Sequence, residues 1–215
     1  MVPSVSMTLA NHRTERYHLL VPVAKGTSLD PARTRESMLA RATDLLYERG
    51  LDGVGIAELC AAVGASKETL YRHFGSKEGL IDAVLAARSD RVIRWLADVA
   101  RAAGPDPEAE LGAIFDALGT WYAEPAFRGC AIVNAATQHH TDPARRVAVR
   151  HLDRYLELLT DIAQRAGAGD PQMLARQLLI LIEGATVVAD HHDTGHGAAE
   201  HAKQAALTLL ATTNR

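Results

Sequence analysis

Four Asp-Pro pairs punctuate the chain, at residues 30–31, 106–107, 142–143 and 170–171. Asp is a preferred helix N-cap, and Pro fits the first turn of a helix because its missing N–H would have no partner there. Each pair is followed by apolar residues at helical spacing, and no segment shows a sustained alternation of apolar and polar residues. The sequence therefore predicts an all-α protein.

The same periodicity, read together with caps and glycine stops, predicts about nine helices. The expected helices cover residues 31–49, 56–63, 66–74, 77–103, 107–121, 128–139, 143–166, 171–192 and 198–210. Residues 1–29 show no helical pattern, and we expect them to form a disordered N-terminal arm.

Composition narrows the class of protein. Of the 215 residues, 47% are hydrophobic and 23% are charged, which is typical of a globular chain. The net charge of −3 gives no broad positive field, so any contact with nucleic acid must come from a few well-placed side chains. No apolar run approaches the roughly 20 residues of a membrane-spanning helix. Cys60 and Cys130 cannot build a disulfide framework, so we expect a cytoplasmic protein without a membrane partner.

Two short helices joined by a tight turn are expected between Ile56 and Phe74, with the sequence IAELCAAV, then GA, then SKETLYRHF. This is the outline of a helix-turn-helix. Leu70 and Phe74 lie four residues apart and would hold the second of these helices against its neighbours. The side chains then left toward solvent are Lys67, Thr69, Tyr71, Arg72 and His73. A short helix that presents such donors suits insertion into the DNA major groove.

Lys77 stands in the first turn of the next helix, where a cation opposes the helix dipole. A bound DNA phosphate, held by the backbone N–H groups, Lys77 and the Tyr71 hydroxyl, would explain it. The alternative is a solvated Lys77 without a role. Arg72 likewise has two interpretations, because it can read a base or pair with Glu68 one turn earlier.

Residues 33–80, and above all LYRHFGSKEGL at 70–80, resemble the DNA-binding domain of the TetR family of bacterial regulators. The positions that match the family pattern are Gly64, Ser66, Thr69, Leu70, Tyr71, His73, Phe74, Ser76 and Lys77. The resemblance implies a homodimer whose third helices enter the major groove at the two halves of a palindromic operator.

The resemblance also implies roles for single residues. Thr69, Tyr71, His73 and Lys77 would contact the DNA backbone, and Lys67 and Glu68 would face bases. The sequence departs from the family at Gly53-Val54-Gly55, where a Ser or Thr cap is common, so the usual phosphate contact of that cap lacks its side chain here. The complete set predicted to bind DNA is Ser66, Lys67, Glu68, Thr69, Tyr71, Arg72, His73 and Lys77.

We therefore expect a DNA-binding domain at residues 30–80 and a ligand-binding and dimerisation domain at 81–215, joined by the long fourth helix. Glu183 interrupts the apolar run 178–182, where an unpaired carboxylate is costly to bury. A polar ligand group, a partner side chain or an interface edge would each explain it. Candidate ligand-pocket residues are Trp95, Phe115, Trp121, Tyr122, Phe127, Asn134, Gln138, Tyr155 and Glu183. The alternative is that the apolar members are ordinary core.

Two stripes on the last two helices predict a dimer interface, because small residues let helices approach closely across a two-fold axis. The stripes consist of Leu178, Ile182, Ala185, Val188, Ala198, Ala202, Ala205 and Leu209. The alternative is that they only close the core of each monomer.

The leading interpretation is a repressor that a small-molecule effector releases from its operator. A metal-sensing regulator is a second possibility, because ten histidines include pairs at 139–140 and 191–192 together with His151, His196 and His201. No HExxH or paired CxxC pattern supports it, so we expect neither a metal site nor a cofactor. A small helical enzyme using Cys130 or a His-Asp pair is a third possibility, but no nucleophile has a recognisable base.

Overall fold

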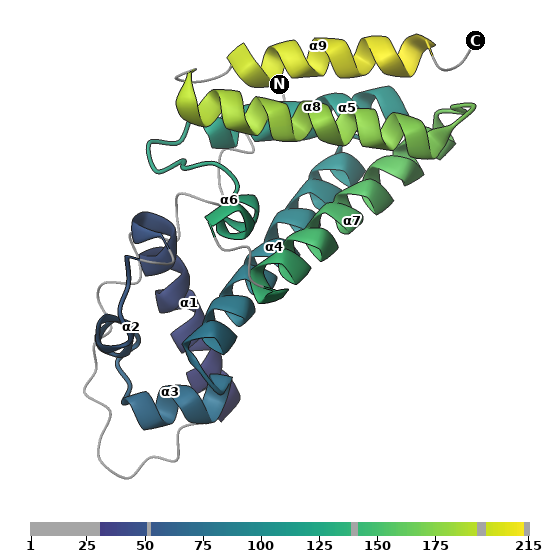
Figure 1. Cartoon of the computed structure of the whole chain (residues 1–215). Coiled ribbons are helices and arrows are strands. Elements are labelled where there is room, and N and C mark those ends of the chain that lie inside the picture. The colour runs from purple at the N-terminus through teal and green to yellow at the C-terminus, as the bar shows by residue number, and fades with distance from the viewer. Residues whose placement is uncertain (1–30, 51–52, 139–141, 193–196, 213–215) are drawn as a thin grey trace. The chain divides into compact units, whose positions relative to one another are not determined.

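The computed structural model describes residues 31–50, 53–138, 142–192 and 197–212, and within these residues it contains nine helices and no strand (Figure 1). The helices are α1 (Pro31–Arg49), α2 (Ile56–Val63), α3 (Lys67–Phe74), α4 (Lys77–Ala102), α5 (Pro107–Tyr122), α6 (Ala131–Gln138), α7 (Asp142–Arg165), α8 (Pro171–His191) and α9 (Gly197–Thr212). The predicted all-α fold is confirmed. The predicted arm, residues 1–29, lies outside the described residues.

The ends of the helices follow from local chemistry. The Asp106 carboxylate accepts a hydrogen bond from Ala109 N–H at 3.2 Å, and the Asp170 carboxylate accepts one from Met173 N–H at 2.9 Å. These side chains satisfy N–H groups that have no partner within α5 and α8. Gly64 ends α2 with a φ of 70°, the left-handed conformation in which glycine carries no steric penalty. The helix starts predicted at these Asp-Pro pairs and the stop predicted at Gly64 are thus confirmed.

The sixth helix begins later than predicted, at Ala131 instead of Arg128. Gly129 has a φ of 69°, which a helix cannot contain. An added Cβ there would lie 3.0 Å from Asp190 Oδ2 and 3.2 Å from Asn134 Nδ2, so the turn has room only for glycine. The error in the predicted boundary comes from this turn, which periodicity alone does not reveal.

Two clusters of buried side chains hold the compact unit formed by residues 35–215. The N-terminal core joins α1–α4 and includes Leu59, Leu70 and Leu80 together with Ile132 of α6 and Val147 of α7. The C-terminal core joins α4, α5, α7, α8 and α9. Helix α4 contributes to both, so the predicted domain boundary near residue 80 falls inside a continuous helix.

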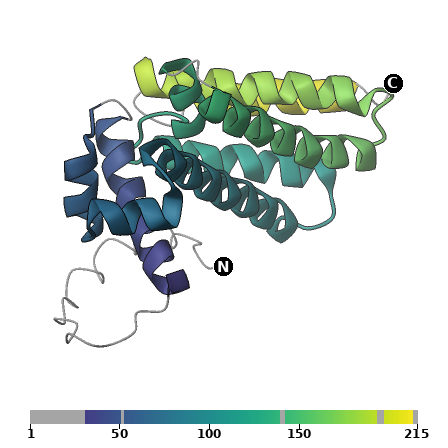
Figure 2. The ribbon, with the colours of Figure 1, turned by 60° about the horizontal axis from the view of Figure 1, so that its bottom comes forward.

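Figure 1 and the turned view in Figure 2 show α4 and α7 side by side, with α5, α8 and α9 gathered at one end of the pair. The aromatic residues of α4 and α5, and the loop that leads from α5 to α6, therefore lie near α7 and α8. This arrangement brings together residues far apart in the sequence.

One described helix, α8, is long and apolar enough to cross a membrane by length and composition, with a mean hydropathy of 1.3 over 18 residues. The sequence analysis predicted that no apolar segment approaches the length of a membrane-spanning helix, and α8 shows that this prediction is wrong. Of that window, 39% is buried inside the protein, and Leu174, Leu178 and Ile182 belong to the C-terminal core. A core helix of a helical bundle has the same composition as a short membrane span.

Candidate nucleic-acid interface and ligand cluster

Helix α3 is anchored to the N-terminal core on one side. Leu70 is completely buried, and Tyr71 and Phe74 are partly buried against the same core. Ser66 begins the helix, because its hydroxyl oxygen accepts a hydrogen bond from Thr69 N–H at 3.2 Å. The anchor predicted from the four-residue spacing of Leu70 and Phe74 is present.

The other side of α3 is open to solvent. Lys67, Glu68 and Arg72 are exposed, and Thr69 and His73 are half-buried. All of them are polar, so the helix presents donors and acceptors over its free face. Such a face has the width and chemistry that the DNA major groove accepts.

Two contacts order this face in the free protein. The Lys67 ammonium lies 5.4 Å from the centroid of the Tyr71 ring. Arg72 Nη2 donates to Glu68 Oε1 at 3.1 Å in a pair that is largely exposed on both sides. This is the alternative expected for Arg72, but an exposed ion pair contributes only about 0.5 kcal/mol and is easily exchanged for a contact to DNA.

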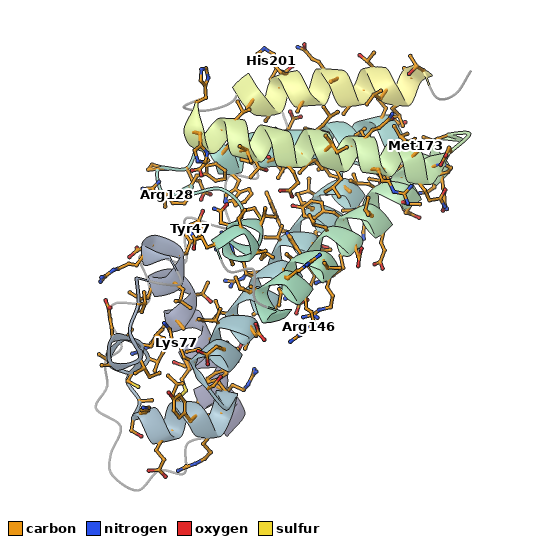
Figure 3. All side chains as sticks on the ribbon, in the orientation of Figure 1. Tyr47, Lys77, Arg128, Arg146, Met173 and His201 are labelled. Carbon is orange, nitrogen blue, oxygen red and sulfur yellow. The ribbon has the colours of Figure 1, made fainter. Side chains whose placement is uncertain are left out.

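Helix α4 starts immediately after α3 and points its N-terminus toward the same region. Ser76 caps it by accepting from Gly79 N–H at 3.0 Å. The free N–H groups at this helix start favour negative charge. Together with Ser76 they lower the pKa of the Glu78 carboxyl. Lys77 forms no hydrogen bond or ion pair with any residue that the structure describes, and Figure 3 shows it at the start of α4.

Two arginines of α1 add positive charge that the sequence analysis did not assign to DNA binding. The Arg35 guanidinium lies 5.0 Å from the centroid of the Phe74 ring, at the end of α3. An added Cβ at Gly64 would lie 3.5 Å from Arg41 Nη1, so Arg41 lies beside the turn between α2 and α3. Their distance in sequence from α3 hides this proximity.

In the C-terminal half, four aromatic side chains form a cluster of ring contacts. Trp121 lies at its centre, with ring centroids 4.9 Å from Phe127, 5.8 Å from Tyr122 and 6.3 Å from Trp95. Phe127 and Tyr122 are buried, whereas Trp95 and Trp121 are half-buried. We call these four residues the aromatic cluster. Its two tryptophans form the rim that solvent reaches.

A second group, which we call the buried polar cluster, adjoins it and consists of Cys130, His151, Tyr155 and Glu183. His151 and Tyr155 are buried, whereas Cys130 and Glu183 are half-buried. His151 Nε2 lies 3.8 Å from Cys130 Sγ, and its ring centroid lies 5.1 Å from that of Tyr155. On its other side, His151 Nδ1 and Ser89 Oγ share a hydrogen bond of 2.9 Å. Burial, with Arg154 and Arg88 nearby, lowers the pKa of His151 to about 4, so the ring is neutral at pH 7.

Glu183 is the unusual member of this cluster. Burial raises the pKa of its carboxyl to about 7. Its charge in turn helps to raise the pKa of the Cys130 thiol, which burial brings to about 11, and that of the Tyr155 hydroxyl. Tyr122 of the aromatic cluster lies near the buried polar cluster, because the charge of Glu183 adds to burial in raising the pKa of the Tyr122 hydroxyl. The same hydroxyl lies 2.8 Å from Thr186 Oγ1.

The structure therefore brings together six of the nine predicted pocket residues and separates three. Phe115 is buried in the C-terminal core without a ring contact to the cluster among the described residues. Asn134 and Gln138 are exposed on α6, so their predicted place in a buried pocket is wrong. Asn134 instead donates to the Arg128 carbonyl at 3.0 Å and holds the turn before α6. His151, Cys130 and Ser89 were not predicted to lie here, because no local pattern links them.

Most residues of the two stripes predicted to form the dimer interface point into the core of the same chain instead of toward solvent. Five of the eight residues face the core of the same chain: Leu178, Ile182, Ala185, Ala198 and Ala202. The alternative, that the stripes close the monomer, holds for these five. The apolar side that α8 leaves uncovered lies about half a turn away, and the large exposed apolar residues on it are Met173, Ile180, Val187 and Val188.

One contact ties the end of α1 to the loop before α6. Arg128 N–H donates to the Tyr47 hydroxyl at 2.9 Å, and Figure 3 shows the two residues facing each other. The Arg88 guanidinium of α4 lies 4.0 Å from the centroid of the Tyr47 ring. Tyr47 therefore contacts both the long helix α4 and the loop that carries Phe127 and Cys130.

Among the described residues, no group of three or more His, Cys, Asp or Glu side chains could hold a metal ion. His139, His140 and His196, which the metal-sensing alternative requires, lie outside the described residues.

Comparison with known proteins identifies what the chain resembles. The model of the family "Bacterial regulatory proteins, tetR family" matches residues 38–84, which contain α2, α3 and the start of α4. The HTH-type transcriptional repressor BdcR of Escherichia coli (strain K12) is 31% identical over 134 residues, which cover 60% of this chain and 67% of BdcR. The HTH-type transcriptional repressor ComR of the same strain is 29% identical over 72% of this chain and 79% of its own length.

Solved structures extend the similarity to the C-terminal half. SCO4454, a TetR-family transcriptional regulator from Streptomyces coelicolor, superposes with a TM-score of 0.76 and 28% identity, covering 86% of this chain and 97% of its own. The reduced form of NemR from E. coli has a TM-score of 0.73 at 20% identity and supports the fold alone. The match thus spans the N-terminal helices and the helical bundle.

Proposed function

Because this chain belongs to the TetR family of bacterial transcriptional regulators, we propose that it is a repressor that binds a palindromic operator as a homodimer and leaves it when a small-molecule effector binds. That it is a DNA-binding regulator and not an enzyme follows from the family. BdcR and ComR are transcriptional repressors, and we extend repression to this chain. A regulator of this kind would work in the cytoplasm.

The observation that carries the proposal is the open polar face of α3 beside Lys77, which pairs with no side chain in the described part of the chain. Lys67, Glu68 and Arg72 would reach base edges, while Thr69, Tyr71, His73 and Lys77 would bind phosphates, with Ser66 positioning the start of the helix. Arg35 and Arg41 would add phosphate contacts on either side of α3. The net charge of −3 over the whole chain does not oppose this, because a few cations at α3 and at the start of α4 would suffice for the phosphate contacts.

The uncovered apolar side of α8 supports the homodimer. Ile180 is 71% exposed and Val187 is 56% exposed, and Met173 and Val188 continue the same face. A row of large apolar residues along one helix is the usual mark of a protein interface. Packed against its own copy across a two-fold axis, α8 would bury this row and set the spacing of the two α3 helices.

The effector would bind at the aromatic and buried polar clusters. Movement there would reach α1 and α4 through Tyr47, which contacts Arg128 and Arg88. An effector that binds better to a conformation with wrongly spaced α3 helices would lower operator affinity by linkage. In this scheme residues 30–80 bind DNA, and residues 81–215 bind the effector and dimerise.

The DNA-binding part is tested with a labelled duplex taken from the sequence upstream of the gene for this protein. We expect protection of two half-sites whose centres lie about 34–36 Å apart, one turn of the duplex. Lys67→Ala should change which base pairs are preferred, whereas Lys77→Ala should weaken binding to all sequences alike. Equal binding of wild type and both variants to every duplex would rule out α3 as the reading helix.

The dimer is tested by sedimentation equilibrium, with Ile180→Glu to place a charge in the uncovered apolar row. Wild type should sediment at twice the chain mass of 23.1 kDa, and the variant at the chain mass. Gln204→Glu on the exposed polar side of α9 is the control and should leave the dimer intact. A wild-type monomer would contradict the homodimer.

A further inference from the structure

We propose that the groove between α4 and α7 is a second binding site, which takes a small molecule bearing a carboxylate or a phosphate group and holds that group on Arg150 and Arg154. The inference goes beyond the proposed function, because none of the residues that line the groove belongs to α3, to the aromatic cluster or to the buried polar cluster.

The groove follows from the packing of the two long helices, which lie side by side in Figures 1 and 2. Its volume of about 330 Å³ is at the lower end of the range of ligand pockets, about 300–1,000 Å³. The lining residues are Ala86, Ser89 and Asp90 of α4 and Val147, Arg150 and Arg154 of α7. A small ligand would thus meet a short apolar wall and a group of polar side chains.

A row of arginines runs along α7 at this groove. Arg150 and Arg154 are one helical turn apart, and Arg146, labelled in Figure 3, precedes them by another turn. Like charges at this spacing destabilise a helix, so the row favours negative charge beside it.

Helix α4 supplies part of that negative charge. Asp90 Oδ1 lies 2.6 Å from Arg154 Nη1. Burial raises the pKa of the Asp82 carboxyl, and Arg146 and Arg150 offset part of that rise, so Asp82 lies near both. Along the groove, three cations therefore face two carboxylates, and one positive charge is left over.

Arg150 is the arginine whose charge is left over. It is exposed, and within residues 31–50, 53–138, 142–192 and 197–212 it forms neither a hydrogen bond nor an ion pair. An anion can therefore bind its guanidinium without displacing another contact. The guanidinium presents parallel N–H groups whose spacing matches the two oxygens of a carboxylate or a phosphate.

Arg154 is held in place at the groove by its neighbours. Its Nη1 atom lies 3.4 Å from Ser89 Oγ, and Ser89, which is only 5% exposed, shares a hydrogen bond of 2.9 Å with His151 Nδ1. The Asp90 side chain is 57% exposed, so it can turn into solvent when an anion replaces it on Arg154. Such partly exposed ion pairs are weak and easily exchanged.

The chemistry of the groove selects for negative charge. A cation would add to the excess positive charge, and a neutral molecule would leave Arg150 without a charged partner. The bound anion would contact α7 through the two arginines and α4 through the Ser89 hydroxyl, so it would bridge the two helices.

The test is calorimetric titration of the full chain at constant ionic strength with three probes: succinate, inorganic phosphate and succinamide, the uncharged counterpart of succinate. We expect at least one anion to bind about tenfold or more tightly than succinamide, and the anion that binds better identifies the acid group as carboxylate or phosphate. Arg150→Gln should weaken its binding about tenfold or more. Arg145→Gln removes the same charge from an exposed position of α7 that does not line the groove, and it should leave the affinity unchanged.

Asp90→Asn gives a second readout, in the opposite direction. It removes the carboxylate that competes for Arg154, so the affinity for the anion should rise about threefold, as expected for the loss of a partly exposed ion pair. A misfolded variant would not bind more tightly, so this gain is independent of any loss of stability.

Four outcomes would overturn the inference: no binding of either anion, equal binding of succinamide and both anions, equal losses in Arg145→Gln and Arg150→Gln, or no gain in Asp90→Asn. Equal losses would mean that diffuse positive charge attracts the anions. Operator binding by wild-type protein is measured without these probes, so failure of this inference leaves the proposed function intact.

Discussion

The polar groups of α3 and those of the buried polar cluster are arranged in opposite ways. On α3 they come from eight consecutive residues, they face solvent, and the apolar side of the same helix holds them in place. In the buried polar cluster they come from three elements, the loop before α6, α7 and α8, and they are buried or half-buried. The comparison indicates that the DNA-facing side can change without cost to folding, whereas each change in the buried cluster alters stability.

The largest change in the free energy of unfolding is expected at Leu70, which holds α3 and its polar face against the N-terminal core. Leu70→Ala removes a completely buried side chain from the N-terminal core and should destabilise the protein by about 2–5 kcal/mol. Denaturant unfolding measures the loss, and operator binding should fall with it. Lys67→Ala, three residues earlier on the exposed side, should change the free energy of unfolding by less than about 0.5 kcal/mol.

Glu183→Gln tests the buried polar cluster through the pH dependence of the free energy of unfolding. The folded-state pKa of about 7 lies above the ordinary value of 4.5, so the folded protein binds more protons than the unfolded chain between these values. Wild type therefore loses stability as pH rises from 4.5 to 7, by about 3 kcal/mol in total, and the loss is complete above pH 7.

The variant lacks this loss. We expect Glu183→Gln to be more stable than wild type by about 3 kcal/mol at pH 8 and equally stable at pH 4.5. His151, whose lowered pKa makes stability fall between pH 6.5 and 4, is present in both proteins and cancels in the difference. A difference that does not change between pH 4.5 and 8 would show that folding does not raise the pKa of Glu183.

Tyr122→Phe should have an intermediate effect. It removes the hydroxyl that bonds Thr186 at 2.8 Å, but Thr186 keeps its own hydrogen bond to the Ile182 carbonyl at 2.8 Å. The expected loss is about 1 kcal/mol of unfolding free energy, measured by denaturant titration. A loss above about 3 kcal/mol would mean that the hydroxyl also supports Glu183 directly.

The smallest effect on folding is expected on α3 itself. Breaking the exposed pair of Glu68 and Arg72 with Glu68→Gln should change the free energy of unfolding by less than about 0.5 kcal/mol. The same change should alter DNA binding, since it frees Arg72 and removes a negative charge from the interface. A loss of stability without a change in DNA binding would contradict the conclusion that the polar residues of α3 serve binding and not folding.

Most of the fold was predictable from the sequence, because its signals are local. Asp106 and Asp170 cap their helices as the Asp-Pro pairs indicate, and Leu70 anchors α3 as its spacing with Phe74 indicates. The start of α6 was missed because Gly129 adopts a positive φ, which the helical spacing of apolar residues in this segment does not reveal.

The aromatic cluster and the buried polar cluster were predictable only in part. Glu183 stood out because it interrupts an apolar run, and the aromatic residues stood out by size. His151 and Cys130 gave no signal, since their contact joins α7 to the loop before α6. Five of the eight predicted interface residues turn into the core because small residues at helical spacing pack equally well inside one bundle, as Ala198 and Ala202 do, whereas Val188 lies on the exposed row.

The salt dependence of DNA affinity tests the central claim most directly. Lys77→Ala removes one cation at the start of α4, and Arg101→Ala removes one from the other end of the same helix, about 36 Å away. If α3 and the N-terminus of α4 bind the operator, Lys77→Ala should flatten the slope of log affinity against log salt by about one unit and Arg101→Ala should leave it unchanged. Equal slopes for wild type and both variants would contradict the assignment of this face to DNA.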